Sequence, residues 1–163
     1  MTTTAGSTLK VGKSKYKLVQ LHFHTPSEHT RYGKHRPMEV HFVHINDKKQ
    51  LAVVGIFMRL GKKPNPLFAK ILENAPQNVG KNVGKNVVKN SMVNGKGLHS
   101  RKMRTYFSYS GSLTTPPCSE QVRWFVMKNS VRVSATQITA FKKLFKHTNR
   151  PTQAMNGRII NKN

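Results

Sequence analysis

Residues 16–24 read YKLVQLHFH, and residues 38–45 read MEVHFVHI. The first stretch alternates polar and apolar side chains, which is typical of a half-buried β-strand. The second is rich in β-branched and aromatic residues and also predicts a strand. The proline- and glycine-containing segment 25–37 between them predicts a loop. A third, continuously apolar run at 51–58 predicts a buried strand, so that three successive strands form an antiparallel sheet.

The remainder of the chain adds two helices and two strands. Asn65 and Pro66 have the residue types of an N-cap and a first helical position, and they predict a short helix that ends near Glu73. Residues 105–113 and 121–128 predict two more strands. Ser134 and Gln137 form a capping box at the start of a second helix, whose apolar face packs on the sheet. Residues 78–90 carry a short NVGK repeat that we interpret as a surface insertion, and the polar segment 150–163 is expected to be irregular.

Charge and composition narrow the function classes. The 163 residues include 29 basic and only five acidic ones, for a net charge of +24. Nonspecific adhesion to polyanions at low salt is expected, but no arginine-rich helix or aromatic–basic motif predicts a specific nucleic-acid partner. The only cysteine is Cys118, which excludes an internal disulfide, and no apolar run is long enough to span a membrane.

Six of the eight histidines lie between positions 22 and 44. Side chains two apart on a strand share a face, so His22 and His24 point the same way on the first strand. On the second strand, His41 shares a face with Glu39 and Val43. If the two strands pair, about 4.8 Å apart, the three histidines converge on one point at which zinc–nitrogen bonds of about 2.0–2.1 Å can form.

Three neutral imidazoles leave one tetrahedral position of a zinc ion open to water, which is typical of catalytic rather than structural sites. Ligating histidines usually donate their second N–H to an oxygen acceptor. Gln20 and Glu39 lie on the same face, each two residues before a ligand, and are expected to hold His22 and His41.

A single His-x-His pair on a strand is weak evidence, because pairs of surface histidines are common. Only the combined positions of His22, His24 and His41 on two neighbouring strands support a metal site, so the prediction is limited to these three histidines. The others are expected to have structural roles: His29, His35, His44, His99 and His147.

Longer motifs around these residues resemble a known family. QLHFHTPSEH at 20–29, MEVHFVH at 38–44 and SGSLTTPPCSEQVRW at 110–124 closely resemble the zinc-binding and second signature segments of alpha-class carbonic anhydrases. The resemblance runs from about residue 7 to 160. It implies one domain over 1–163, mainly β with minor α, built on a twisted, mostly antiparallel central sheet that is incomplete at the N-terminus.

The resemblance also implies the reaction and the residues that perform it. Zinc would lower the pKa of its water to about 7, a value known for carbonic anhydrase itself, and the bound hydroxide would attack carbon dioxide to give bicarbonate and a proton. Thr114 matches the threonine that accepts a hydrogen bond from this hydroxide, and Glu28 matches the carboxylate that accepts from the threonine. The backbone near Gly157 matches the hydrogen-bond partner of His24. The residues that match the lining of the carbon dioxide pocket are Val43, Val53, Leu113, Thr115, Val122 and Trp124.

This sequence departs from the family at its N-terminus. Family members usually exceed 200 residues, and the segment that normally precedes the first zinc strand supplies further sheet strands and the histidine that shuttles protons. No histidine here matches that shuttle, and Cys118 lies where many secreted members pair with an N-terminal cysteine. We therefore expect buffer-limited turnover, low stability, and self-association through an exposed sheet edge.

Two alternatives to the zinc lyase stay open at this point. One is a truncated, non-catalytic remnant of the family, and the other is a basic, polyanion-binding module on the same fold. Met1 to Val11 shows no signal-peptide pattern. A longer natural N-terminus would predict a periplasmic or secreted protein, and otherwise a cytoplasmic one.

Overall fold

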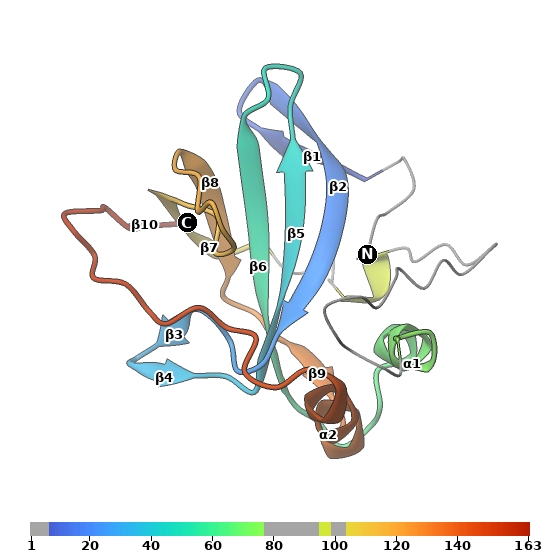
Figure 1. Cartoon of the computed structure of the whole chain (residues 1–163). Coiled ribbons are helices and arrows are strands. Elements are labelled where there is room, and N and C mark those ends of the chain that lie inside the picture. The colour runs from blue at the N-terminus through green and yellow to red at the C-terminus, as the bar shows by residue number, and fades with distance from the viewer. Residues whose placement is uncertain (1–6, 77–94, 99–103) are drawn as a thin grey trace.

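A computed structural model describes residues 7–76, 95–98 and 104–163. In these residues, one curled sheet has the strand order β1-β2-β5-β6-β8-β7-β10, with β9 pairing separately with β6 (Figure 1). Its strands are β1 Thr8–Val11, β2 Ser14–His24, β5 Met38–Ile45, β6 Leu51–Leu60, β7 Tyr106–Gly111, β8 Val122–Met127, β9 Val131–Val133 and β10 Asn161–Lys162. The other elements are the small β3–β4 hairpin (Thr30–Arg31 and Lys34–His35), α1 Pro66–Glu73, α2 Ala135–Leu144 and the 3₁₀ turn η1 Gly95–Leu98.

The centre of the sheet follows the predicted order. Strands β2, β5 and β6 are consecutive antiparallel neighbours, and His22 of β2 lies directly opposite His41 of β5. An irregularity between Leu18 and Gln20 shifts the pairing of β2, so the register is set anew just before the histidines. The predicted mainly β architecture is confirmed, with strands β7 and β8 also antiparallel.

Three features of the fold differ from the predicted one. Strand β6 pairs in parallel with both β8 and β9, which makes the sheet mixed. The predicted loop 25–37 contains the β3–β4 hairpin. Residues 161–162, expected to be irregular, form β10 against β7. Long-range pairing determines the first and the third, and a local pattern does not report it; the β3–β4 hairpin is local and closes at Tyr32 and Gly33, which both have positive φ.

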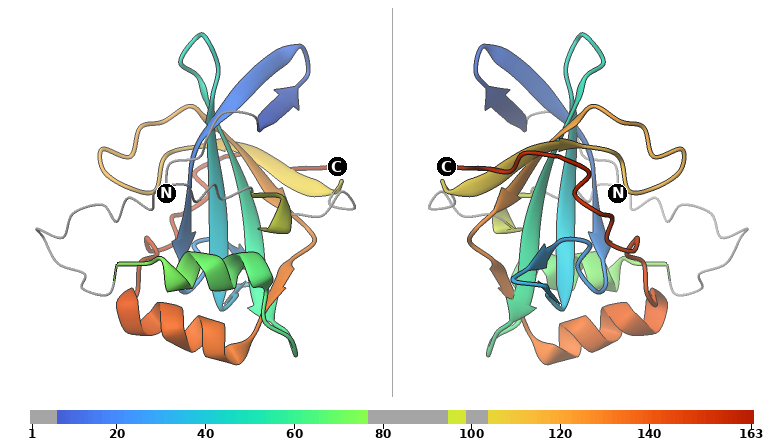
Figure 2. Two further views of the ribbon diagram at one scale, coloured as in Figure 1. Left: turned by 90° about the vertical axis from the view of Figure 1, so that its right-hand side faces the viewer. Right: turned by 90° about the vertical axis from the view of Figure 1, so that its left-hand side faces the viewer.

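Both helices begin as predicted. The side chain of Asn65 accepts from the Phe68 N–H at the start of α1, and Ser134 and Gln137 form the capping box of α2. Figures 1 and 2 show the two helices side by side near one end of the sheet, away from the β1–β2 hairpin. Apolar side chains of the helices, such as Phe68 and Phe141, pack against Leu21, Val40 and other residues of one sheet face.

The opposite face carries a second, smaller cluster of Val43, Val53, Val122 and Trp124. Because neighbouring residues of a strand point to opposite faces, Val40 and Phe42 enter the helix-covered core while His41 and Val43 point to the other side. The predicted faces of β5 are therefore confirmed.

The sheet has edges at β1 and at β10 in the described part of the chain. Self-association through such an edge stays a prediction. Within the described residues, no helix is long and apolar enough to cross a membrane. The NVGK insertion at 78–90 and His99 lie outside the described residues.

Candidate metal centre

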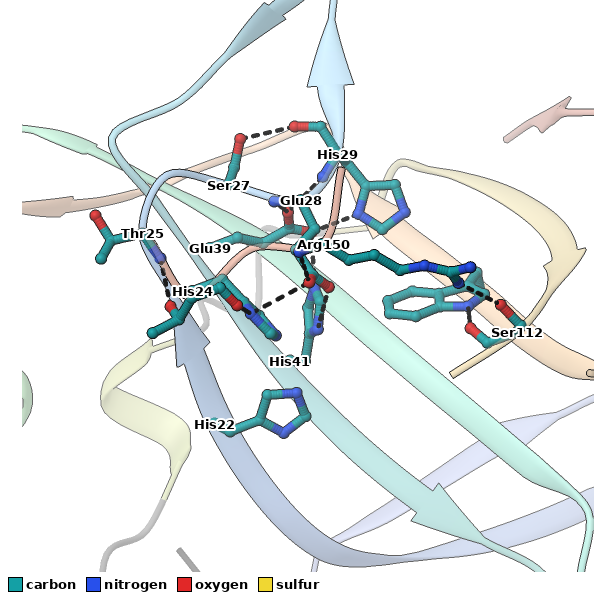
Figure 3. A network of polar contacts seen from close by, with 12 residues as sticks. His22, His24, Thr25, Ser27, Glu28, His29, Glu39, His41, Ser112 and Arg150 are labelled. Atoms are coloured by element: carbon teal, nitrogen blue, oxygen red, sulfur yellow. Dashed lines mark hydrogen bonds and ion pairs between the residues drawn. The ribbon is translucent and has the colours of Figure 1, made fainter. Parts of the chain in front are cut away.

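Three histidine rings meet on the sheet face opposite the helices. His22 and His24 come from β2 and His41 from β5, and their ring centroids lie 4.6–5.3 Å apart. One nitrogen of each lies within 4.8 Å of one nitrogen of the other two, as a shared metal ion requires. Figure 3 shows the three rings turned toward one another. The predicted convergence is therefore present in the structure.

The Nδ1 atoms of His22 and His24 are engaged in hydrogen bonds, which leaves their Nε2 atoms free. His22 Nδ1 lies 2.9 Å from Gln20 Oε1, as predicted. His24 Nδ1 lies 2.8 Å from the carbonyl oxygen of Thr148. Both acceptors fix the ring proton on Nδ1 and leave Nε2 as the lone-pair donor. His24 Nε2 is buried without a hydrogen-bond partner.

The expected backbone partner of His24 near Gly157 is wrong. The chain after α2 instead brings the Thr148 carbonyl to His24, and the Thr148 side chain also accepts from the Thr25 N–H at 3.0 Å. The Thr148 N–H also donates to the Thr25 carbonyl at 3.1 Å, so Thr148 holds the end of β2 through three hydrogen bonds. Nothing in the local sequence around Thr148 distinguishes it from other threonines.

His41 is almost fully buried and faces carboxylates on two sides. Its Nε2 lies 3.1 Å from Glu39 Oε1, an ion-pair contact whose angle falls short of a hydrogen bond. Its Nδ1 has no hydrogen-bond partner and lies 3.8 Å from Glu28 Oε2. Since Nε2 faces Glu39, Nδ1 is the atom that can serve a metal ion.

Glu39 organises the loop behind the histidines. It is completely buried, and its Oε2 accepts from the backbone N–H groups of Glu28 and His29 at 3.0 and 2.9 Å. Its Oε1 lies 2.7 Å from His29 Nδ1, and His29 Nε2 lies 2.8 Å from the Tyr109 hydroxyl. The expected structural role of His29 is therefore confirmed.

These contacts determine the charge states of Glu39 and His29. Burial alone would raise the pKa of Glu39, but His29 and His41 hold it well below its usual range. Burial would likewise lower the pKa of His29, yet the Glu39 carboxylate raises it. His29 and Glu39 therefore form a buried charged pair. With both nitrogens of His29 engaged, the neighbouring trio of His29, Glu39 and His41 is less suited to a metal than the first.

The two histidines of β2 are held neutral. Burial, with added repulsion from His41 and His24, lowers the pKa of His22 to about 3. Burial and His41 also lower the pKa of His24. A neutral imidazole is the ligating form. The buried, unpartnered Nε2 of His24 and Nδ1 of His41, together with the Nε2 of the half-buried His22, therefore fit a divalent ion.

Glu28 is buried beside this trio. Its Oε1 accepts from the backbone N–H of Arg150 at 2.7 Å, and its Oε2 has no hydrogen-bond partner in the described residues. Thr114 lies half-buried in the loop after β7. The structure shows no hydrogen bond between the two, so their relay stays a prediction, and Oε2 is the free acceptor that it needs.

An apolar surface adjoins His41. The Trp124 ring lies 4.8 Å from the His41 ring, and its indole N–H donates to the Ser112 carbonyl at 3.0 Å. Five of the six predicted pocket residues gather there, four in the second cluster and Leu113 packed against it. Thr115, the sixth, is exposed and lies outside this cluster.

Sequence reasoning missed three residues of the site: Tyr109, Thr148 and Arg150. Arg150 contacts Glu28, and Thr148 contacts His24, through backbone groups, which carry no side-chain signal. Arg150 begins the segment that was predicted as irregular, and no element was predicted at Thr148. Tyr109 lies on a correctly predicted strand, but its partner His29 is 80 residues away.

The chain matches a family model and several known proteins over most of its length. The family model for eukaryotic-type carbonic anhydrase matches residues 1–163. A carbonic anhydrase of Nostoc sp. is 41% identical over 95% of this chain and 57% of its own, and one of Klebsiella pneumoniae is 37% identical over 97% and 62%. A hyperthermostable carbonic anhydrase from an active hydrothermal vent chimney is 44% identical, with a TM-score of 0.90 over 99% of this chain and 70% of that one.

Proposed function

Because this chain belongs to the eukaryotic-type carbonic anhydrase family, we propose that it catalyses the reversible hydration of carbon dioxide at a zinc ion held by His22, His24 and His41. The observation that carries this proposal is the set of three converging imidazoles whose free nitrogens lie within 4.8 Å of one another. The chain spans about 57–62% of the length of the two curated relatives above. The activity of those longer proteins is therefore proposed for this chain and not assigned to it.

The donor set supports zinc over harder ions. Imidazole nitrogen suits zinc, whereas magnesium and calcium prefer oxygen ligands. Three neutral ligands leave a fourth, tetrahedral position to solvent. When bound, zinc would supply a water ligand with a pKa of about 7, a value known for carbonic anhydrase itself.

The chain's own residues then have separate tasks. Gln20 and Glu39 orient the rings of His22 and His41, and the Thr148 carbonyl orients His24. Glu28 is fixed by the Arg150 N–H and has a free Oε2. The Thr114 hydroxyl would donate to this Oε2, which would turn its oxygen lone pair toward the reacting hydroxide and let it accept from that hydroxide. The cluster around Trp124 and Val53 provides an apolar, water-poor surface that suits a small nonpolar substrate.

The first alternative is a non-catalytic remnant of the family. The partial span of the relatives favours it, while the intact ligand set and its hydrogen-bond partners favour the enzyme. The second alternative, a polyanion-binding module, has the net charge of +24 in its support. Zinc loading and catalysis separate the three.

Stopped-flow measurement of carbon dioxide hydration tests the proposal. The zinc-loaded protein should accelerate hydration, and a chelator should abolish the effect. Removing a residue that only supports a metal ligand typically lowers activity about 10–100-fold. His41→Ala removes a ligand itself, so it should lower the hydration rate by more than this. His35→Ala, which changes an exposed histidine on β4, is the matched control and should keep its rate. A folded, zinc-loaded protein without hydration activity would overturn the proposal and favour the remnant.

A further inference from the structure

Arg150 contacts two separate parts of the site. Its backbone N–H donates to Glu28 Oε1 at 2.7 Å, and its guanidinium Nη1 donates to the Ser112 hydroxyl at 3.4 Å. Figure 3 shows the Arg150 side chain extending away from Glu28 toward Ser112. Pro151 follows directly and disfavours a helical backbone at Arg150, in agreement with the irregular chain found there. The guanidinium of Arg150 thus links Ser112 to the segment that holds Glu28.

Ser112 lies at the start of the loop that carries Thr114. This loop follows β7, and Ser112 precedes Thr114 by two positions. The Ser112 carbonyl accepts from the Trp124 indole N–H at 3.0 Å, and the N–H of Leu113 donates to the Ser119 carbonyl at 2.9 Å. The residues just before Thr114 are therefore held by hydrogen bonds to the sheet and within the loop.

An arginine side chain suits a link between these two segments. Its guanidinium stays charged at any physiological pH and presents its N–H groups in one rigid plane. Arg150 is half-buried, so its side chain is partly shielded from solvent. A lysine would place a single ammonium group on a flexible stem, and a glutamine would be shorter and uncharged. Substitutions of Arg150 can therefore weaken the link in steps, while the backbone N–H stays available to Glu28.

From these contacts, we propose that Arg150 is a positioning residue for Thr114. Its two hydrogen bonds hold the loop of Thr114 in a fixed place relative to Glu28, the carboxylate to which the Thr114 hydroxyl would donate. In the described part of the chain, none of the hydrogen bonds of Arg150 involves a proposed zinc ligand. Arg150 therefore acts on the Thr114–Glu28 pair and not on the metal. The inference rests on the proposed function, since that function gives Thr114 its role.

Hydrogen exchange of the Trp124 indole N–H in the metal-free, full chain tests the link itself. Trp124 is the only tryptophan of the chain, so its indole signal in a nuclear magnetic resonance spectrum is unambiguous. Arg150→Gln should raise the exchange rate severalfold, because Ser112, which accepts from this N–H, opens more readily. Ser112→Ala, which keeps the carbonyl but removes the hydroxyl, should raise the rate to the same extent.

Two further variants separate the link from general effects. The double variant of Arg150→Gln and Ser112→Ala should exchange no faster than either single variant, because both remove the same contact. Arg123→Gln is the matched control, since it removes an exposed arginine directly before Trp124 on β8. It should leave the indole exchange rate unchanged.

Carbon dioxide hydration by the zinc-loaded protein tests the positioning role. In Arg150→Gln, kcat/KM should fall about tenfold, because small misplacements of a reacting group are costly. Zinc affinity, measured by competition with a chelator, should stay at the wild-type value, which the loss of a ligand or of the fold would not allow. Arg150→Lys keeps a charged donor and should recover part of the lost kcat/KM.

Three results would overturn the inference. Equal indole exchange rates in the wild type, Arg150→Gln and Ser112→Ala would show that Arg150 does not hold the loop. Wild-type kcat/KM in folded Arg150→Gln would show that the link does not position Thr114, and a parallel fall in zinc affinity would place Arg150 with the metal. The failure of the proposed function is distinct: the zinc-loaded wild type would then be inactive, and the catalytic role of Arg150 would fall with it.

Discussion

Substitution of Glu39 by glutamine should weaken zinc binding although Glu39 is not itself one of the three proposed ligands. Glu39 Oε2 accepts two backbone N–H groups, so the single oxygen of a glutamine side chain must occupy that position. The NH₂ group then faces His29 Nδ1 and His41 Nε2. To accept from it, His41 would have to carry its proton on Nδ1, the nitrogen that the metal needs.

The size of this effect follows from the contact that is lost. The contact between Glu39 and His41 is an ion-pair contact at 3.1 Å, and leaving a buried polar group without its partner costs about 1–3 kcal/mol. At about 1.4 kcal/mol per tenfold, zinc affinity should fall about 5- to 150-fold. The Gln20–His22 contact is neutral and exposed, so Gln20→Ala should cost only about 0.5–1.5 kcal/mol, or about 2- to 10-fold.

Competition with a chelator of known zinc affinity measures both variants against the wild type. Circular dichroism on the same samples confirms that each variant is folded. If folded Glu39→Gln retained wild-type zinc affinity, the assignment of His41 Nδ1 as the metal-facing nitrogen would be wrong.

Three further predictions follow from the same contacts. A methyl group at Gly55 would lie 2.7 Å from Glu39 Oε1. Gly55→Ala should therefore lower the free energy of unfolding, measured by urea denaturation, by about 1–3 kcal/mol. An unchanged urea midpoint would contradict this close packing. In the metal-free protein, burial holds the pKa of His22 at about 3, below its usual 6.5. As the pH drops, the unfolded state therefore binds a proton at His22 before the folded state does. The free energy of unfolding falls for this reason between about pH 6.5 and pH 3. His22→Gln should therefore lose less free energy of unfolding between pH 7.5 and 5.5 than the wild type, and equal losses would refute this reasoning. Because no histidine here matches the family's proton shuttle, added imidazole buffer at constant pH should speed carbon dioxide hydration, and a rate independent of buffer concentration would show another route for the proton.

The parts of the site that lie close together in sequence were predictable. His22, His24 and Gln20 share one strand face by alternation alone, and pairing of β2 with β5 brings His41 opposite His22. The two helices were predictable because Asn65, Ser134 and Gln137 act on backbone groups within one turn. In each case, the interaction spans few residues or a single strand pair.

The parts that were missed depend on contacts between distant segments. The Thr148 carbonyl reaches His24 across 124 residues, and a carbonyl group is present at every position, so it carries no sequence signal. The parallel pairing of β6 with β8 and β9 depends on how the chain crosses the sheet and not on the pattern of any one strand. The contact of the Arg150 guanidinium with Ser112 was also not predicted, because the two residues lie 38 positions apart.

Zinc K-edge X-ray absorption of the zinc-loaded chain tests the proposed metal centre most directly. The geometry predicts three imidazoles at about 2.0–2.1 Å and one further nitrogen or oxygen ligand, with no sulfur. The His41→Ala variant should lose one imidazole from this shell or fail to retain the metal. A spectrum with two or fewer imidazoles in the wild type, or with a sulfur ligand, would contradict the assignment of these three histidines.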